Sequence, residues 1–180
     1  MPRLRDVVVP RPRLLLVGIN PGRRSGAVGH HFAGNGNPFW RLLHAARLVP
    51  VPLAAADDAR LVEHGLGITN LCARATRSAA ELTPAEKREG AEVLREKVAG
   101  LRPGVVALVG VSLFPLVFPG SNERGPGAKR ARLAGARVFV LPNPSGLNAA
   151  YPGFDSKLVW FRRLAKLVRK VSRGAPRAAS

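Results

Sequence analysis

The 180-residue chain has a single cysteine, Cys72, and this scarcity excludes an internal disulfide. Because there is no second cysteine and there are only four histidines, we expect neither a zinc or iron–sulfur site nor another cofactor. No apolar run approaches the roughly 20 residues that a membrane helix needs, so no membrane partner is expected. The basic segment Met1–Arg13 also lacks the long apolar core of a secretory signal. Together these absences predict a protein of the reducing cytoplasm.

Acidic residues are scarce as well, and they are unevenly distributed. Eleven Asp and Glu stand against 29 Lys and Arg, which gives a formal net charge of +18. Eight of the eleven acids fall between residues 57 and 96, so the rest of the chain carries the excess positive charge. Such a field attracts polyanions and predicts a nucleic-acid partner. The alternative is that an arginine-rich composition only keeps the protein soluble.

Three apolar runs predict strands that are buried on both faces, because none of them alternates with polar residues. They span Arg13–Ile19, Val105–Val109 and Val138–Leu141. A weaker fourth candidate is Leu66–Leu71.

Helices are predicted between these strands. Asn37–Pro38 is a cap and first-turn signal before an apolar segment, and Thr83–Glu86 is a capping box that opens a helix closed by Gly100. Leu158–Val171 has apolar residues at helical spacing, with Lys and Arg on the remaining surface. These charges either face solvent or supplement a contact with DNA.

Strands that alternate with helices predict an α/β fold. We expect a single domain over residues 1–172, with a mainly parallel central sheet flanked by helices on both faces. Residues 173–180 are expected to form a flexible basic tail.

Two loops rich in proline and glycine follow predicted strands, at the edge where open parallel sheets bind ligands. They are Gly18–Gly22 (GINPG) and Leu141–Asn148 (LPNPSGLN). Proline fixes φ and glycine permits a close approach, so both loops can hold a ligand rigidly. Each loop taken alone is equally compatible with a tight turn that leaves a sheet.

Taken together, the motifs of the chain resemble those of the mismatch-specific uracil/thymine DNA glycosylases. GINPG is followed by HHFAGNGNPFW at His30–Trp40, by GITN at Gly67–Asn70, by ELTPAEKREG at Glu81–Gly90 and by NPSGL at Asn143–Leu147. The resemblance implies a monofunctional glycosylase that flips uracil out of double-stranded DNA and hydrolyses its N-glycosidic bond in base excision repair. Uracil opposite guanine is the implied substrate, with etheno-cytosine or thymine opposite guanine as alternatives.

The resemblance also assigns roles to single residues. Asn20 matches the catalytic position that orients the water attacking the deoxyribose C1′. Phe32 matches the aromatic residue that stacks on the flipped base, and the backbone around Ile19 and Phe32 would hydrogen-bond the uracil edge. Asn70 corresponds to a polar residue near the base pocket. Ser25 lies near a position where thymine-accepting relatives have a smaller residue, which favours uracil.

The late NPSGL motif corresponds to the loop that enters the duplex. Asn143, Ser145, Gly146 and Leu147 would form this wedge loop, with Leu147 filling the gap that the flipped nucleotide leaves. An uncharged apolar side chain can replace the lost stacking, and Asn143 would help to hold the loop. Relatives often place a basic residue shortly after the leucine, whereas Asn148–Ala150 follows here, so dependence on the opposite guanine is left open.

The GINPG region has no carboxylate nearby in sequence, since neither Asp nor Glu occurs between Asp6 and Asp57. An amide can position water but cannot deprotonate it, and a general base typically contributes about 10²–10⁴-fold. We therefore predict slow excision, limited further by retention of the abasic product. The first lysine is Lys87, so Schiff-base lyase chemistry is not expected.

Several alternatives remain open at this point. Arg23 and Arg24 would either grip phosphates beside the flipped nucleotide or be solvated. His30 and His31 would contact phosphate or the pocket, or form an exposed loop without a catalytic role. The function of a different class is a non-catalytic basic α/β module that binds DNA or a nucleotide at the strand ends. A monomer associated with the nucleoid is the default expectation.

Overall fold

The computed structural model describes residues 4–174, and it confirms the predicted single-domain α/β fold with one central sheet. The sheet has five strands in the order β2-β1-β3-β5-β4. Four strands are parallel, and β4 pairs antiparallel with β5 at one edge. The strands are β1 (Leu14–Gly18), β2 (Leu66–Asn70), β3 (Val105–Val109), β4 (Gly127–Leu133) and β5 (Ala136–Leu141).

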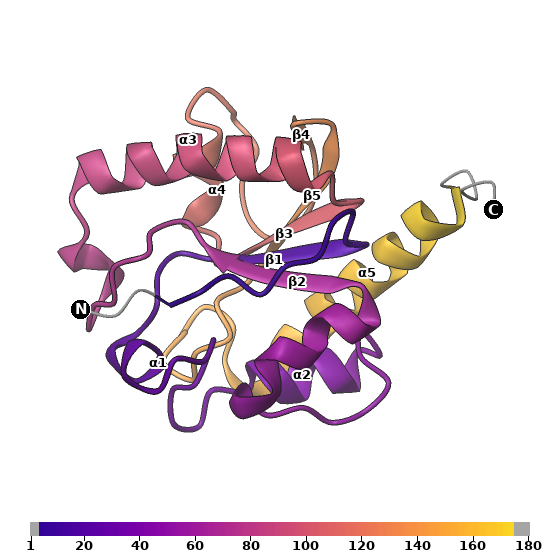
Figure 1. Cartoon of the computed structure of the whole chain (residues 1–180), viewed down its shortest axis with the longest axis horizontal. Coiled ribbons are helices and arrows are strands. Elements are labelled where there is room, and N and C mark those ends of the chain that lie inside the picture. Colours follow the sequence, from indigo (N-terminus) through magenta and orange to yellow (C-terminus); the bar gives the residue numbers. More distant parts are fainter. Residues whose placement is uncertain (1–3, 175–180) are drawn as a thin grey trace.

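Helices cover both faces of the sheet, with α3 and α4 on one face and α2 and α5 on the other (Figure 1). The short helix α1 lies at one end of the sheet, directly after β1. The α-helices are α1 (Arg23–Val28), α2 (Phe39–Ala45), α3 (Pro84–Leu101), α4 (Leu113–Val117) and α5 (Gly153–Gly174), and the 3-10 helices are η1 (Ala55–His64) and η2 (Ala79–Glu81).

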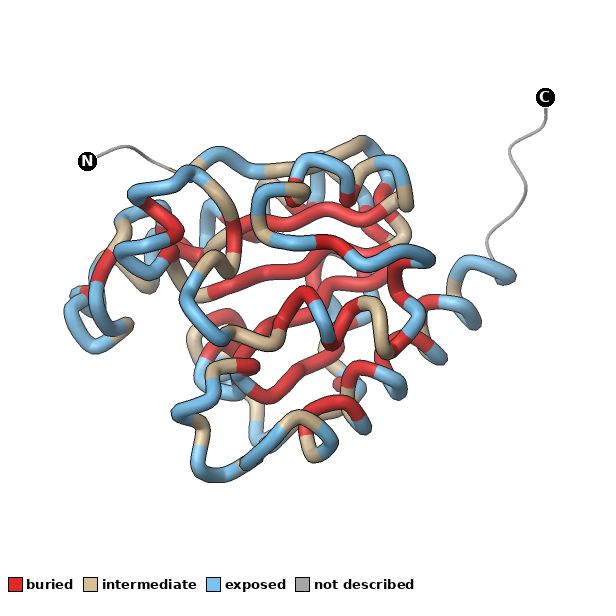
Figure 2. Tube along the Cα trace, turned by 90° about the horizontal axis from the view of Figure 1, so that it is seen from below, coloured by how far each residue is buried: buried red, intermediate tan, exposed pale blue. Residues whose placement is uncertain are grey.

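Alternation along β1 builds the two layers of the core. Leu14 and Leu16 belong to the apolar cluster on the α2/α5 face, whereas Leu15 and Val17 belong to the cluster on the α3/α4 face. All four side chains are fully buried, and Figure 2 shows the strands buried along their lengths among exposed loops. Burial of each such side chain stabilises the fold by about 1.5–3 kcal/mol, so the sheet is a rigid platform for the loops at its ends.

Local signals define the ends of α3. The predicted capping box is present, because Thr83 Oγ1 accepts from Glu86 N at 3.1 Å and Glu86 Oε2 accepts from Thr83 N at 2.7 Å. The prediction that Gly100 closes this helix was wrong, since Gly100 lies within α3. The helix instead ends at Leu101, and its C-cap residue is Arg102, whose φ of 53° lies in the left-handed region.

The sequence did not reveal the edge strand β4, whose segment GAKRARL is rich in charge. Its inward positions include Lys129 and Leu133, which are both buried. The ammonium group of Lys129 donates to the carbonyls of Arg124 and Gly125 at 2.9 and 2.7 Å, and it lies 5.2 Å from the centroid of the Phe114 ring. A lysine therefore occupies a core-facing position, which masks the alternation that normally identifies a half-buried strand.

Helix α5 carries the predicted apolar stripe, with Leu158, Phe161 and Leu164 buried against the sheet. It continues through Gly174, two residues into the segment that was expected to be a tail. The remaining tail residues, 175–180, lie outside the described residues. None of the helices in the described part of the chain is both long enough and apolar enough to span a membrane.

Candidate active site

The loops that carry the sequence motifs meet at one edge of the sheet, where the parallel strands end. β1 leads into the Gly18–Gly22 loop, β2 into the loop 71–78, and β5 into the Leu141–Asn148 loop. The first two loops are neighbours, because β1 pairs with β2. β3 separates β1 from β5, so the Gly18–Gly22 and Leu141–Asn148 loops lie two strand spacings, about 10 Å, apart.

The side chain of Asn20 is held through its amide nitrogen. Nδ2 donates to Thr76 Oγ1 at 2.6 Å, to the Arg74 carbonyl at 2.9 Å and to the Pro21 carbonyl at 3.2 Å. Thr76 Oγ1 in turn donates to the Ser78 carbonyl at 2.8 Å, so it can only accept from Asn20. All three partners are acceptors, and this fixes which end of the amide is nitrogen and which is oxygen.

This orientation leaves Oδ1 of Asn20 as the atom that can meet a ligand. Within residues 4–174, every hydrogen bond of the Asn20 side chain is made by Nδ2. An amide oxygen can accept a hydrogen bond from water and orient it, but it cannot take the proton. No Asp or Glu side chain in the described part of the chain hydrogen-bonds to Asn20. The group is therefore suited to positioning a nucleophile and not to general-base catalysis.

Backbone hydrogen bonds dock the GINPG loop onto the loop after β2. Three N–H groups of the second loop donate to carbonyls of the first at 2.8 to 3.0 Å: Leu71 to Gly18, Cys72 to Ile19, and Thr76 to Pro21. A Cβ on Gly26 in α1 would lie 2.6 Å from the Cβ of Ala75, so only glycine permits this close approach. The frame around Asn20 is consequently rigid, and Ile19 packs against the core beneath it.

Phe32 and Asn70 converge on the end of β1. A Cβ on Gly18 would lie 2.6 Å from Asn70 Oδ1 and 3.4 Å from Phe32 Cζ, so both side chains face the bare backbone of this glycine. Phe32 stacks on Phe39 with ring centroids 3.9 Å apart, and its φ of 50° lies in the left-handed region. An aromatic face and an amide thus stand beside a backbone that a planar ligand can approach closely.

Ser25 and the two preceding arginines occupy α1. The hydroxyl of Ser25 is buried and accepts a hydrogen bond from Ala33 N at 3.0 Å, so it holds the residue that follows Phe32. Arg23 and Arg24 are exposed on the first turn of α1, at the same edge as the Asn20 loop. The structure therefore places Ser25 as a support for the Phe32 loop, while the two arginines remain accessible.

A buried carboxylate anchors the two histidines that precede Phe32. Asp58 Oδ2 accepts from the His31 backbone N–H at 2.9 Å and lies 3.1 Å from His31 Nδ1, and Asp58 Oδ1 lies 3.1 Å from His30 Nδ1. Trp40 Nε1 donates to the His31 carbonyl at 3.1 Å. His31 is therefore a buried anchor and not part of an exposed loop, and Trp40 is a core residue.

The electrostatics of this anchor favour a neutral imidazole beside an ionised carboxylate. Burial lowers the pKa of His31 below its ordinary value, against the opposing effect of Asp58. Burial raises the pKa of Asp58, but hydrogen bonds from the His31 N–H and the two imidazoles outweigh it and hold that pKa below its usual range. Nδ1 of His31 then carries the proton shared with Asp58, and Nε2 is buried without a partner among the described residues.

The Leu141–Asn148 loop presents Leu147 to solvent. This side chain is 95% exposed, the most exposed large apolar group among the described residues. The loop is folded by its own polar groups: Ser145 N donates to Asn143 Oδ1 at 2.9 Å, Leu147 N donates to Ser145 Oγ at 3.3 Å, and Asn148 Nδ2 donates to the Asn143 carbonyl at 3.0 Å. Gly146 lies exposed at the tip. Asn143 and Ser145 thus shape a turn that projects a leucine.

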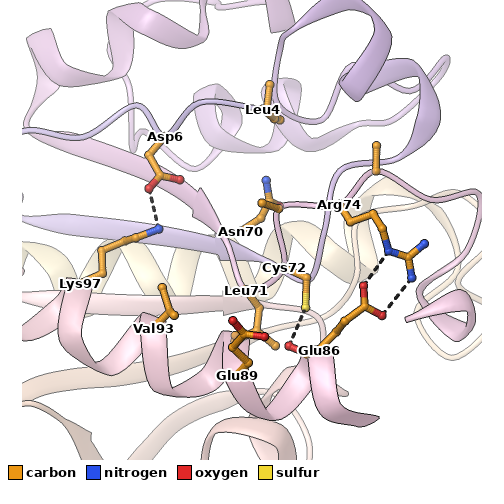
Figure 3. Close-up of a pocket in the computed structure, with 13 residues that line it drawn as sticks. Leu4, Asp6, Asn70, Leu71, Cys72, Arg74, Glu86, Glu89, Val93 and Lys97 are labelled. Carbon is orange, nitrogen blue, oxygen red and sulfur yellow. Dashed lines mark hydrogen bonds and ion pairs between the residues drawn. The ribbon is translucent and has the colours of Figure 1, made fainter. Parts of the chain in front are cut away.

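A cavity of about 600 Å³ lies outside β2, between the N-terminal segment and α3, and shares Asn70 and Arg74 with the site (Figure 3). Four of its charged groups pair with one another, Lys97 with Asp6 at 2.5 Å and Arg74 with Glu86 at 2.6 Å. The Arg74 hydrogen bond lowers the pKa of Glu86 to about 2. The ion pair with Glu86 therefore holds Arg74, whose carbonyl accepts from Asn20. Phe32 is not among the residues that line the cavity.

Three supporting residues had escaped the sequence analysis. Thr76 and Arg74 hold the Asn20 amide, and Asp58 holds the loop of Phe32. Each acts across 27 or more positions of the chain, so no local motif identifies it. Only Asp58 offered a signal in the sequence: no basic residue follows it three or four positions later, so a local ion pair does not explain this carboxylate.

Comparison with known proteins identifies a family for this chain. The family model described as the uracil DNA glycosylase superfamily matches residues 6–165, a span that includes the Asn20, Phe32, Asn70 and Leu147 loops. Members of this superfamily are DNA-repair hydrolases that act on DNA. The chain belongs to the uracil DNA glycosylase superfamily.

Proposed function

We propose that this protein is a mismatch-specific, monofunctional uracil-DNA glycosylase that removes uracil opposite guanine from double-stranded DNA. The observation that carries the proposal is the Asn20 side chain, whose nitrogen is held by three acceptors so that its oxygen is left for a water molecule. Etheno-cytosine, and thymine opposite guanine, are the alternative substrates.

The proposal requires that the target nucleotide leaves the helix. Extrusion costs a few kcal/mol and costs least for a mismatched base, which gives selectivity without reading sequence. The exposed Leu147 supports this step, because an apolar wedge can take the place of the departed base. The flipped base would enter beside Gly18, stack on Phe32 and hydrogen-bond to Asn70 and to the backbone near Ile19.

In the proposed reaction, Asn20 Oδ1 orients a water molecule toward the deoxyribose C1′. The water oxygen forms a bond to C1′ as the bond from C1′ to the base nitrogen breaks, uracil leaves with the electron pair, and the water loses a proton to solvent. Backbone N–H groups at the strand end can stabilise the departing anion without a titratable group. No carboxylate touches Asn20 within the described residues, so we expect slow excision.

DNA would bind across the carboxyl edge, with the protein acting as a monomer. Arg23 and Arg24 are exposed beside the Asn20 loop and are the candidates for phosphate contacts. Replacing both with alanine should flatten the dependence of DNA affinity on salt, by about 0.9 in log–log slope for each phosphate that is no longer bound. An unchanged slope would assign both side chains to solvent.

A panel of labelled duplexes tests the function. Each carries one uracil opposite guanine, uracil opposite adenine, thymine opposite guanine or etheno-cytosine opposite guanine, and alkali cleaves the strand wherever a base has been released. The proposal predicts release of uracil, fastest opposite guanine. Tight DNA binding without release from any duplex would instead support the alternative, a non-catalytic DNA-binding module of the same fold.

A further inference from the structure

The edge of the sheet opposite the candidate active site is strongly basic. β1, β3 and β5 begin there: Arg137 N donates to the Gly104 carbonyl at 3.2 Å, and Arg13 N donates to the Gly65 carbonyl at 2.8 Å. The last turns of α5 reach the same edge, where Val171 Cγ1 lies 3.2 Å from the position of a Cβ on Gly104. The exposed basic residues here, called the amino-edge patch, are Arg11, Arg47, Arg102, Arg132, Arg137, Arg169, Lys170 and Arg173.

The positive charges of the patch are crowded and are not neutralised by acids of residues 4–174. No patch residue forms an ion pair with an acid in the described part of the chain. Arg132 and Arg137 lie directly opposite each other on β4 and β5, a like-charge pairing that destabilises a sheet. Burial, and then the charge of Arg169, lowers the pKa of Arg13 at the base of the patch.

Three arginines of the patch also occupy backbone conformations that favour glycine. Arg11, Arg47 and Arg102 have φ values of 51°, 58° and 53°, in the left-handed region. An L-residue with a side chain is strained there, whereas glycine is not. Arg11 N donates to the carbonyl of Leu101 at 2.7 Å, so Arg11 and Arg102 lie in adjacent turns. None of these three exposed side chains forms an ion pair among the described residues, and the left-handed backbone disfavours any side chain there.

We propose that the amino-edge patch binds the phosphate backbone of a second DNA duplex while the carboxyl edge engages the first. Seven of its eight residues are arginines, whose planar fork matches phosphate better than the point charge of lysine does. We assign the patch to a second duplex because it lies far from the candidate active site. Helix α5, with 22 residues, spans about 33 Å from the carboxyl edge of the sheet toward the amino edge. In Figure 1 the Asn20 loop and α1 lie at the left end of the sheet, and the last turns of α5 lie at the right end.

Two duplex sites on one molecule have a consequence for the search for damage. A protein that grips a second segment before it releases the first can pass between duplexes without diffusing into solution. Such transfer needs only backbone contacts without base readout, which is the binding mode that arginine and phosphate provide. The inference rests on the DNA substrate of the superfamily and adds a second surface to the one where excision is proposed.

Native mass spectrometry with short duplexes lacking uracil tests the inference through the number of duplexes bound per protein chain. The patch variant combines Arg102→Gly, Arg137→Gln and Arg169→Gln, and the glycine suits the left-handed conformation, so the fold should be retained. The matched control removes three exposed arginines outside the patch, with Arg88→Gln, Arg130→Gln and Arg162→Gln. Both variants are also assayed for single-turnover uracil excision, and their folding is checked by circular dichroism.

The wild type and the control are expected to bind two duplexes per chain, and the patch variant one, with second-duplex affinity reduced at least about tenfold. Excision by the patch variant should stay within about twofold of the wild type, because no substituted residue adjoins Asn20. One duplex on the wild type, or two on the patch variant, would overturn the inference. So would wild-type binding of one duplex together with phosphatidylglycerol vesicles, which would assign the patch to a membrane surface. Two duplexes without any excision would refute the proposed function alone.

Discussion

Replacement of Thr76 by valine tests whether the hold on the Asn20 amide matters for catalysis. Thr76 Oγ1 accepts the shortest of the three hydrogen bonds from Asn20 Nδ2, at 2.6 Å, and Thr76 is buried. Valine keeps the shape of the side chain but removes the acceptor, which leaves bonds of 2.9 and 3.2 Å to the carbonyls of Arg74 and Pro21. The Asn20 oxygen would then be less well fixed where the water must lie.

The magnitude follows from the worth of one hydrogen bond. A net contribution of about 0.5–1.5 kcal/mol corresponds to roughly a 2- to 13-fold change in rate if all of it serves orientation. We therefore expect Thr76→Val to lower the single-turnover rate of uracil excision about tenfold, with DNA affinity changed less than about twofold. The rate is measured by alkali cleavage of a labelled duplex at saturating enzyme, and the affinity by fluorescence anisotropy.

Thr76→Ser is the matched control, since it keeps the hydroxyl that accepts from Asn20 and donates to Ser78. It should retain most of the wild-type rate. If Thr76→Val excises uracil as fast as Thr76→Ser, with both proteins folded, the three-acceptor hold on Asn20 has no catalytic role. A decrease that appeared only in DNA affinity would likewise exclude a catalytic role for this hold.

Three further predictions address the wedge, the buried histidine and a strained turn. Leu147→Ala should leave the free energy of unfolding within about 0.5 kcal/mol of the wild type, because the side chain is 95% exposed. It should slow uracil excision from duplex DNA but not from single-stranded DNA, and equal slowing on both substrates would refute the wedge role. Burial lowers the folded-state pKa of His31, so its contribution to stability is complete above the ordinary pKa of 6.5 and is lost as pH falls below it. In urea unfolding from pH 7.5 to 5.5, the free energy of unfolding should therefore decline less steeply for His31→Gln than for the wild type, and parallel curves would contradict this. Arg102→Gly should raise the free energy of unfolding by about 0.5–1 kcal/mol, because glycine is not strained at the left-handed φ of 53°. Thermal unfolding measures this change, and a clear loss of stability would show that the arginine side chain supports the fold.

The parts of the fold that sequence could predict are those fixed by local chemistry. Unbroken apolar runs identify β1, β3 and β5 because strands buried on both faces need no polar alternation. The Thr83 capping box identifies the start of α3 in the same way. The edge strand β4 could not be predicted because Lys129 faces inward, a placement that depends on its hydrogen bonds to the carbonyls of Arg124 and Gly125.

The candidate site likewise contains residues that the sequence predicts and residues that it does not. Asn20, Phe32 and Leu147 stand in motifs that are recognisable in the sequence, and the topology of the sheet then brings their loops to one edge. Thr76 and Asp58 act through contacts to residues 56 and 27 positions away, which only the folded chain makes visible. The hydrogen bond from Ala33 N to the Ser25 hydroxyl is likewise visible only in the folded chain.

The most direct test of the central claim is single-turnover release of uracil from a duplex with one uracil opposite guanine, by the wild type and by Asn20→Ala. We expect release by the wild type and a loss of at least about 100-fold in Asn20→Ala, with DNA affinity in anisotropy within about threefold. Release by Asn20→Ala at the wild-type rate would contradict the account, because the water would then be positioned by another group.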